Sequence, residues 1–195
     1  MERIAFFPSV IGHTVIDKNT DQLKSNTVFH SSNNNYLEDE IRDYHCLDRF
    51  PRIKKIILNE FLKFIQELGY DDNFKISTSW FTIVETGEEG HFHNHKNCFY
   101  SGIYYYDEYD EDSATVSFES PNIHQSGLYV IPKENNSYNA HSVEFAPKKN
   151  LLIFFPNYLQ HKVNKHRGNV SRHSLAFNFI PTKTFGIGDS TVDFS

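Results

Sequence analysis

The stretch GHFHNHKNCFYSGIYYYD, residues 90–107, places histidines at alternate positions 91, 93 and 95 and continues into a tyrosine-rich segment typical of a strand. Successive side chains of a strand alternate between its two faces, so the three imidazoles are expected on one face. A metal ion can take two ligands two residues apart on such a strand, and a third must come from a neighbouring strand. The candidate is His161, which follows an apolar run and a Pro-containing turn in FFPNYLQH (154–161).

The chain after Gly69 reads as a series of short strands. Its apolar runs are rich in Ile, Val, Phe, Tyr and Thr, and turn residues separate them. Many short strands with this punctuation favour a sandwich or barrel over alternating strands and helices. The expected strands span 74–86, 99–107, 114–120, 127–132, 141–147, 150–156, 159–165 and 172–180.

One clear helix precedes these strands, in PRIKKIILNEFLKFIQELGY (51–70). Its apolar residues recur at helical spacing, and Pro51 and Gly69 suit its first turn and its end. We expect its apolar face to pack on a sheet. Residues 4–17 suggest one or two short strands, and residues 18–40 suggest a polar loop. The expected fold class is therefore mainly β with flanking helices.

Length and composition indicate one folded domain. The 195 residues include 15% aromatic and 23% charged residues, and the net charge is −6 with histidine neutral. No cluster of Lys and Arg occurs, so we expect no nucleic-acid partner. No run of about 18 apolar residues occurs, so we expect no membrane span and a soluble, cytoplasmic protein. Within the domain 1–195 we expect N-terminal strands, loop and helix (1–72), a core with the metal site (73–182) and a tail (183–195).

The stretch SRHSLAFNF (171–179) places polar side chains on one face of a strand. Arg172, Ser174 and Asn178 share that face, whereas the leucine and phenylalanines of the other face belong to a core. A buried arginine is costly unless it is paired. Its partner is either an internal carboxylate or the carboxylate of a ligand, which a guanidinium binds with two parallel hydrogen bonds.

Three blocks in this order resemble the 2-oxoglutarate and Fe(II)-dependent dioxygenases, in the branch related to prolyl hydroxylases. They read HNHKNCFYSGIYY (93–105), FFPNYLQH (154–161) and RHSLAFNF (172–179). Similar sequences are familiar from marine bacteria and their phages, where the host cytoplasm would be the location. The resemblance covers roughly residues 74–180. It implies a double-stranded β-helix (jelly-roll) core, which agrees with the strand count.

The resemblance also implies a site and a reaction. It implies that His93, His95 and His161 hold Fe(II), and that Arg172, helped by Ser174, binds the far carboxylate of 2-oxoglutarate. The implied activity is that of an oxidoreductase, a hydroxylase that uses O2 and converts 2-oxoglutarate to succinate and CO2. Further candidates for lining the pocket are Asn97, Tyr104, Tyr106 and Asn178.

The expected metal site departs from the family pattern at one position. The usual triad is two histidines and one carboxylate, whereas His95 stands where the acid normally lies. Three alternatives for this ligand remain open: His95 itself, His91 if the pair is HFH, and a carboxylate such as Glu119.

Two other functions remain open from the sequence. One is a cupin-like three-histidine metalloprotein that does not use 2-oxoglutarate, and the other is a non-catalytic jelly-roll binding protein. Arg172 distinguishes the first, because such a protein needs no arginine at that position. Family analogy implies a peptide, amino-acid side chain or small molecule as substrate, with segments 18–46 and 120–141 as lids. The oligomeric state is open.

Overall fold

A computed structural model describes residues 8–16, 23, 43–71, 73–122, 128 and 130–193 of the chain. Its helices are η2 (Cys46–Arg49), α1 (Pro51–Glu67) and η3 (Gly188–Ser190), of which η2 and η3 are short 3-10 helices. Its strands are β1 (Gly12–Val15), β2 (Phe74–Val84), β3 (Tyr100–Tyr104), β4 (Val116–Glu119), β5 (Ser142–Phe145), β6 (Leu151–Pro156), β7 (His161–Val163) and β8 (Arg172–Pro181).

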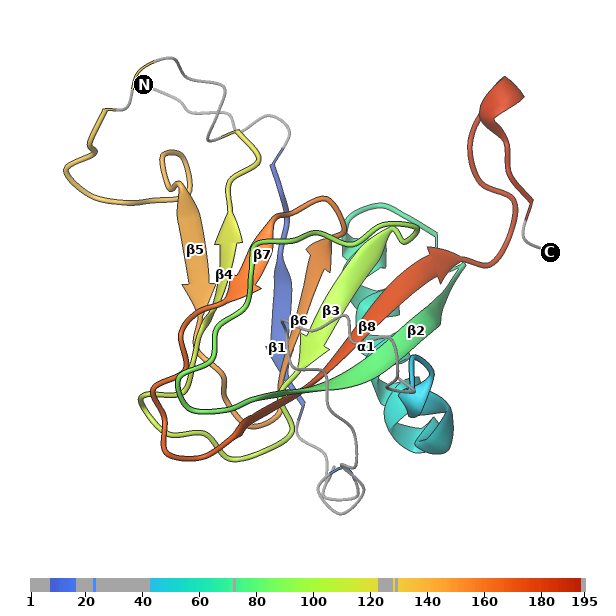
Figure 1. Ribbon diagram of the computed structural model, residues 1–195. Helices are drawn as coiled ribbons and strands as arrows, with labels where there is room; N and C mark the ends of the chain where they lie inside the picture. Colours follow the sequence, from blue (N-terminus) through green and yellow to red (C-terminus); the bar gives the residue numbers. More distant parts are fainter. Residues whose placement is uncertain are drawn as a thin grey trace.

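The strands form two facing antiparallel sheets, as Figure 1 shows. The larger sheet has the order β1-β6-β3-β8-β2, and the smaller sheet has the order β5-β4-β7. A backbone bridge between His93 and His161 extends the smaller sheet, because each residue's N–H donates to the other's carbonyl, at 3.0 and 2.9 Å. This is the jelly-roll architecture expected from the sequence, and the fold prediction is confirmed.

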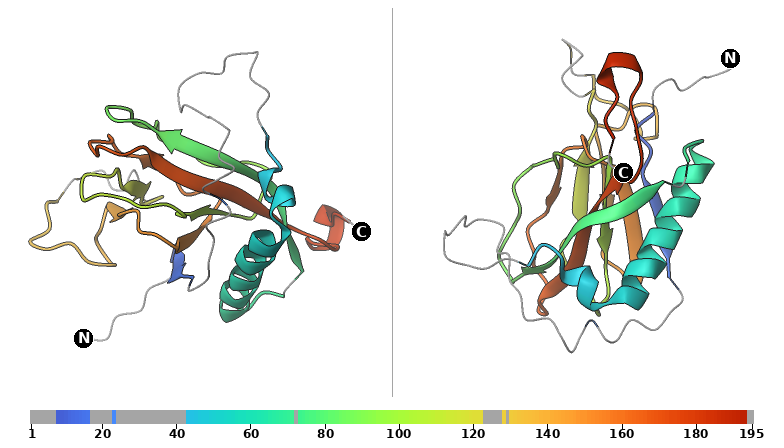
Figure 2. Two further views of the ribbon diagram at one scale, coloured as in Figure 1. Left: turned by 90° about the horizontal axis from the view of Figure 1, so that it is seen from below. Right: turned by 90° about the vertical axis from the view of Figure 1, so that its right-hand side faces the viewer.

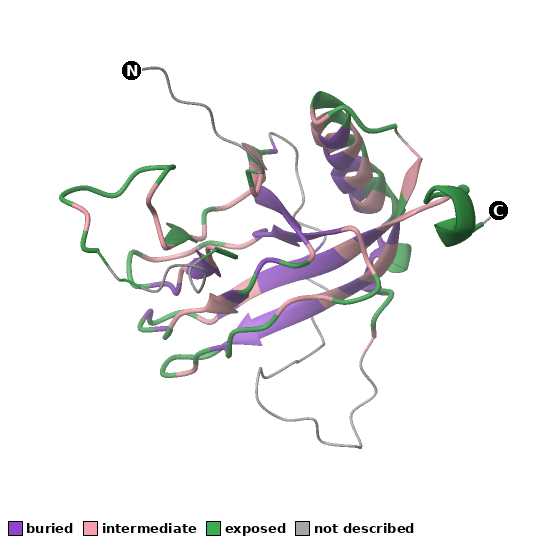
Figure 3. Cartoon of the chain, turned by 90° about the horizontal axis from the view of Figure 1, so that it is seen from above, coloured by how far each residue is buried: buried purple, intermediate pink, exposed green. Residues whose placement is uncertain are grey.

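Alternation along the strands divides the larger sheet into an inner and an outer face. The outer face packs against α1 through one hydrophobic core, and the inner face packs against the smaller sheet through a second. Figure 2 shows α1 lying across the outer face, and Figure 3 shows its buried side turned toward the sheet. Phe61 anchors this packing, since its ring stacks on Phe179 with centroids 3.7 Å apart. Two layers of core therefore hold the inner face in place.

The helix predicted at 51–70 is confirmed in type and position. Pro51 occupies its first turn, where the missing N–H costs nothing, and Gly69 follows its end with a φ of 84°. None of the described helices has the length and apolar character needed to cross a membrane. The predicted N-terminal strand region is represented by β1, whereas residues 4–7 and most of 18–40 lie outside the described residues.

The strand predicted at 127–132 is wrong for the part that the structure describes. Residues 130–132 are not in a strand, and residues 123–127 and 129 lie outside the described part. Leu128, Val130 and Ile131 are each more than three-quarters exposed. Their apolar character predicted a strand, but a strand also needs a hydrogen-bonding neighbour, which periodicity does not reveal. The other predicted strands are present with ends shifted by up to three residues.

The glycine of the SGIYY block is required by close packing. A Cβ at Gly102 would overlap the ring of Phe177 and lie 2.9 Å from the Ile153 carbonyl oxygen. Gly102 sits in the central strand β3, between β6 and β8, so neither neighbour can move away easily. We expect Gly102→Ala to lower the free energy of unfolding by about 1–3 kcal/mol, the usual cost of overpacking a core. Urea unfolding measures this change, and an unaltered midpoint would contradict the close approach.

Candidate metal and co-substrate site

The HxH segment approaches the smaller sheet without forming a regular strand. Only His93 of residues 91–95 bridges to a neighbour, and that neighbour is His161 at the start of β7. Asn97 then takes a left-handed φ of 57° and turns the chain toward β3. Its side chain is exposed, and no contact brings it to the histidines. Asn97 therefore serves the turn, and its expected place among the co-substrate contacts stays a prediction.

The structure brings three of the expected ligands together. One ring nitrogen from each of His93, His95 and His161 lies within 4.8 Å of the others. The ring centroids of His93 and His161 are 4.3 Å apart, and those of His95 and His161 are 5.0 Å apart. His93 is exposed, His95 half-buried and His161 buried, so the cluster lies between the protein interior and solvent. The described residues contain no other such group of three.

Hydrogen bonds at Nδ1 orient all three imidazoles. Nδ1 of His93 lies 2.9 Å from the His91 carbonyl oxygen, and Nδ1 of His161 lies 3.0 Å from that of Leu159. Nδ1 of His95 lies 2.8 Å from both Ser101 Oγ and Asn178 Oδ1. A carbonyl oxygen accepts only from a protonated nitrogen, so each ring carries its proton on Nδ1 and keeps the Nε2 lone pair for a ligand. This is how metal-binding histidines are usually held.

The site also favours neutral imidazoles. Burial, followed by the charge of His93, lowers the pKa of His161 to about 3. Burial is the largest cause that lowers the pKa of His95, although its hydrogen bond to Asn178 acts in the opposite direction. Phe118 and Phe155 supply the apolar surroundings of His161, with ring centroids 5.7 and 4.6 Å from it. Because only neutral imidazole binds a metal, His95 and His161 are in the ligand form at neutral pH.

The two alternatives to His95 lie elsewhere. Phe118 pairs with His161 across β4 and β7, so both side chains face the inner space. Glu119 is the next residue along β4 and projects from the opposite face. His91 is exposed and contributes its carbonyl oxygen to His93. Among the described residues, the cluster has no carboxylate, so its donor set is three neutral nitrogens.

Those three nitrogens suit a divalent transition metal. Imidazole binds Fe, Ni, Cu and Zn, and the three-nitrogen set carries no negative charge. A bound divalent ion would therefore keep its full charge, which favours anionic ligands in its remaining positions. The residues present fit Fe(II), with His95 in the place of the acid.

Arg172 is buried at the start of β8, with 1% of its surface exposed. Its Nε donates to the Ala114 carbonyl oxygen at 2.8 Å, and its Nη2 donates to the Tyr105 hydroxyl at 2.6 Å. Its Nη1 lies 3.4 Å from Ser174 Oγ, which places the guanidinium along β8 toward the histidine end. These partners within the described chain are all neutral, so the internal carboxylate considered from the sequence is not found there. A buried positive charge with neutral partners suits an anionic ligand.

Two tyrosines considered as candidates for lining the pocket, Tyr104 and Tyr106, lie in the hydrophobic core, and their neighbour Tyr105 lies beside Arg172. Tyr104 faces α1 in the outer core, where its hydroxyl donates to Asn150 Oδ1 at 3.0 Å. Tyr106 is buried in the same core. The side chain of Tyr105 points to the opposite face of the sheet and contacts the guanidinium of Arg172. Ser101, a polar residue in an apolar strand, marks the inner face of β3, and Tyr105 shares its alternation; this signal was present in the sequence.

Asn178 acts on His95. Its Oδ1 accepts hydrogen bonds from His95 and from Ser101 Oγ, and its Nδ2 donates to Thr78 Oγ1 at 2.9 Å. The amide thereby fixes which ring nitrogen of His95 carries the proton. Asn178 was expected to contact the co-substrate, whereas its observed contacts place it behind a metal-ligand candidate. Ser101 and Thr78 are further members that sequence reasoning missed.

We expect Asn178→Ala to weaken metal binding about tenfold, the lower end of the usual effect of such supporting groups, because Ser101 still contacts His95. Titration of the metal-free protein with Ni(II) measures the dissociation constant. Asn94→Ala is a suitable control, since within the described part of the chain its amide contacts the Tyr158 carbonyl oxygen alone. Equal affinities for the two variants would contradict the role assigned to Asn178.

Comparison with known proteins places this chain in a family. The model of the family described as "Putative 2OG-Fe(II) oxygenase" matches residues 78–178, just over half of the chain. The match runs from β2 to β8 and includes the three histidines and Arg172. No curated protein matches the sequence.

Solved structures share the fold. HygX from Streptomyces hygroscopicus, with nickel and 2-oxoglutarate bound, is 8% identical, with a TM-score of 0.55 over 89% of this chain and 83% of that one. A 2OG-Fe(II) oxygenase family oxidoreductase from Burkholderia pseudomallei is 14% identical, with a TM-score of 0.41 over 55% of this chain. A Pseudomonas putida prolyl-4-hydroxylase is 16% identical, with a TM-score of 0.38 over 55% of this chain. The chain spans 43% and 51% of the lengths of the latter two proteins.

At these low sequence identities the solved structures support the fold alone, and the assignment to a family depends on the family model. The chain belongs to the 2OG-Fe(II) oxygenases, a family of enzymes that use Fe(II), 2-oxoglutarate and O2.

Proposed function

We propose that this protein hydroxylates a C–H bond of an amino-acid side chain, a peptide or a small molecule. Substrate, O2 and 2-oxoglutarate would be converted to hydroxylated substrate, succinate and CO2, so one oxygen atom enters each organic product. Bound Fe(II) supplies the activation of O2 that this oxidation requires. The cluster of three imidazoles, each held at Nδ1 by a carbonyl oxygen, is the observation that carries the proposal.

His93, His95 and His161 would hold the iron. The Nδ1 bonds support this role, because they fix ring orientation and leave one lone pair on each ring. The iron that the three histidines hold would also bind the co-substrate and O2 and would supply the activation of O2. Without a protein carboxylate, the carboxylates of 2-oxoglutarate become the main counter-charges of the ion.

Arg172, Ser174 and Tyr105 would bind the far carboxylate of 2-oxoglutarate. Burial raises the pKa of Tyr105, so its phenol stays protonated at neutral pH. Its oxygen accepts from Arg172, which leaves its own O–H to donate to a ligand. Ser101 lies beside His95, and Tyr105 lies beside Arg172. These two residues of one extended segment are four positions apart, so their Cα atoms are separated by about 13 Å at the usual rise of a strand. The proposed co-substrate would have to reach from the histidine cluster to Arg172 across this interval.

The substrate would approach from the exposed side of the cluster, near His93. Trp80 lies beside His95, with their ring centroids 5.5 Å apart. Tyr44 in turn meets the edge of Trp80 and is 45% exposed. These aromatic rings favour a substrate with an apolar or cationic part. We further propose that the protein belongs to the prolyl-hydroxylase-related branch and acts in the cytoplasm.

The cupin-like alternative lacks an explanation for Arg172. A metalloprotein without 2-oxoglutarate has no need of a buried guanidinium whose described partners are all neutral, and such a group is costly to keep. The non-catalytic alternative likewise leaves the orientation of three imidazoles unexplained.

Anaerobic addition of Fe(II) and 2-oxoglutarate tests the proposal directly. We expect a weak visible absorption band that needs both components, because the co-substrate binds the metal itself. Admission of O2 should then convert 2-oxoglutarate to succinate slowly even without substrate. Succinate is measured by chromatography, with the metal-free protein as the control. Stoichiometric iron binding without the band and without succinate would favour the cupin-like alternative.

A further inference from the structure

His166 is a fully buried imidazole outside the metal cluster. It lies in the connection between β7 and β8 and has no exposed surface. Its Nδ1 accepts a hydrogen bond from the Ala114 N–H at 3.1 Å, and its Nε2–H donates to the Val170 carbonyl oxygen at 2.7 Å. Both nitrogens are therefore satisfied by backbone groups. The N–H facing Nδ1 requires the neutral ring with its proton on Nε2, the opposite tautomer to that of the three clustered histidines.

The Ala114 peptide groups connect this imidazole to Arg172. The N–H of Ala114 is bound to His166, and the carbonyl oxygen of Ala114 accepts from Arg172 Nε at 2.8 Å. Ala114 is itself buried, so water does not replace either bond. A shift of this one residue would move the acceptor that holds the guanidinium.

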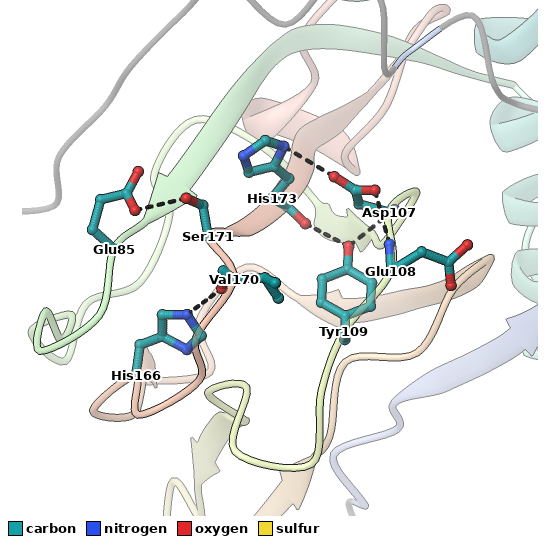
Figure 4. Close-up of polar contacts among 8 residues, drawn as sticks. All are labelled: Glu85, Asp107, Glu108, Tyr109, His166, Val170, Ser171 and His173. Atoms are coloured by element: carbon teal, nitrogen blue, oxygen red, sulfur yellow. Dashed lines mark hydrogen bonds and ion pairs between the residues drawn. The ribbon is translucent and has the colours of Figure 1, made fainter.

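His166 also holds the strand from which Arg172 projects. Figure 4 shows the bond from its ring to Val170, two residues before Arg172. The residues on either side of Arg172 are held as well, since Ser171 Oγ donates to Glu85 and the His173 carbonyl oxygen accepts from Tyr109. The imidazole thus contacts Val170, two residues before Arg172, and the N–H of Ala114, whose carbonyl oxygen accepts from Arg172 Nε.

Tight packing keeps the ring in this position. A Cβ at Gly168 would lie 2.7 Å from His166 Cε1 and would overlap the Asp110 carboxylate. The backbone of His166 is also held, because its N–H donates to Glu88 and its carbonyl accepts from Gly87, both at 2.8 Å. The ring cannot turn to exchange its two bonds without moving this loop.

We propose that His166 is a positioning residue that aligns Arg172 with the far carboxylate of 2-oxoglutarate. The inference rests on the proposed function, in which Arg172 binds that carboxylate. His166 itself would not touch the co-substrate. Its bond to Ala114 sets the guanidinium, whereas its bond to Val170 is supported by the contacts of Ser171 and His173, which also hold the start of β8.

Two substitutions separate these bonds. In His166→Asn the side-chain oxygen can take the place of Nδ1 and accept from Ala114, whereas in His166→Gln the terminal amide can take the place of Nε2–H and donate to Val170. We expect His166→Gln to weaken 2-oxoglutarate binding about tenfold, the loss of one well-placed hydrogen bond. His166→Asn should stay within about threefold of the parent protein. Calorimetric titration of the Ni(II)-loaded chain with 2-oxoglutarate measures both.

Asp110→Ala is the matched control for loop stability. Asp110 joins the same two loops by accepting from Ser113 Oγ and the Asn169 N–H, without touching Ala114 or Arg172. It should lower the melting temperature but leave 2-oxoglutarate affinity unchanged, and all three variants should bind Ni(II) normally. If Asp110→Ala weakens 2-oxoglutarate binding as much as His166→Gln does, His166 is merely structural and the proposal is overturned.

Arg172→Ala in the same series tests the proposed function separately from the role of His166. Normal 2-oxoglutarate affinity in Arg172→Ala would refute the proposed function itself, whereas loss there with normal affinity in His166→Gln would refute only the role of His166. If His166→Gln does not fold, the parent protein loaded with Zn(II) provides the test by NMR. Addition of 2-oxoglutarate should then shift the Ala114 amide and Arg172 Nε–H signals together, and an unshifted Ala114 amide would overturn the proposal.

Discussion

His161→Ala should lose stoichiometric metal binding. His161 is the most buried of the three clustered imidazoles, and its Nδ1 is held by the Leu159 carbonyl oxygen. Structural metal sites gain about 10–16 kcal/mol from roughly four ligands, or about 3 kcal/mol for each. Removal of one of three ligands should therefore raise the dissociation constant for Ni(II) or Fe(II) more than a hundredfold. Metal analysis after gel filtration, together with calorimetric titration, measures the loss.

His91→Ala is the control for this experiment. It removes a histidine from the same short run, but its ring is exposed and outside the cluster. Metal affinity should be unchanged. If His91→Ala lost the metal while His161→Ala kept it, the ligand pair would be His91 and His93 and the three-histidine cluster would not be the binding site.

Arg172→Ala should bind metal normally but lose 2-oxoglutarate. Removal of the buried charged partner of a carboxylate costs about 2–5 kcal/mol of binding free energy. The dissociation constant for 2-oxoglutarate should therefore rise by roughly 30- to several thousandfold. The visible band of the Fe(II) complex should be absent at co-substrate concentrations that saturate the parent protein. Arg167→Ala, an exposed arginine in the β7–β8 connection, should leave both affinities unchanged.

A second substitution at position 172 tests the role of Arg172 through the melting temperature of the protein. Arg172→Met replaces the buried charge with an apolar side chain of similar length. It removes a desolvation cost of several kcal/mol, and in return leaves the Ala114 carbonyl oxygen without its donor, at about 1–3 kcal/mol. Without 2-oxoglutarate, its melting temperature should therefore equal or exceed that of the parent protein, while co-substrate binding is lost. A large drop in melting temperature would indicate that Arg172 is kept for folding, against the proposed role in binding.

Elements with a long periodic signal were predictable from the sequence. The apolar repeat of α1 spans several turns, and its ends are marked by Pro51 and Gly69, so type and position both agree with the structure. Most strands were also correct, because buried runs between turn residues have few other solutions in a chain of this length. The segment 127–132 shows the limit. Its apolar residues satisfy a strand pattern, but no described strand pairs with residues 130–132.

The face of the sheet toward which each side chain points was harder to predict. In the run YYY (104–106), every residue is aromatic, so composition cannot show which side chains face α1 and which face the site. The structure assigns Tyr104 and Tyr106 to the outer core and Tyr105 to Arg172. In β2 a bulge between Ile76 and Thr78 reverses the alternation, so that Ile76 joins the outer core while Thr78 contacts Asn178 on the inner face. Such a bulge re-aims side chains without leaving a pattern in the sequence.

The sequence by itself determined the mainly β class, the helix, and the histidines capable of binding a metal, and its motifs indicated the jelly roll by resemblance. Each of these depends on local spacing or on motifs within a few residues. Only the tertiary structure decided that Glu119 points away from the cluster, that Tyr105 contacts Arg172, and that His166 reaches Arg172 through Ala114. Those contacts join segments 50 or more residues apart. They depend on the registers of several strand pairs at once, and a shift of one residue in any of them would turn the side chains to the other face.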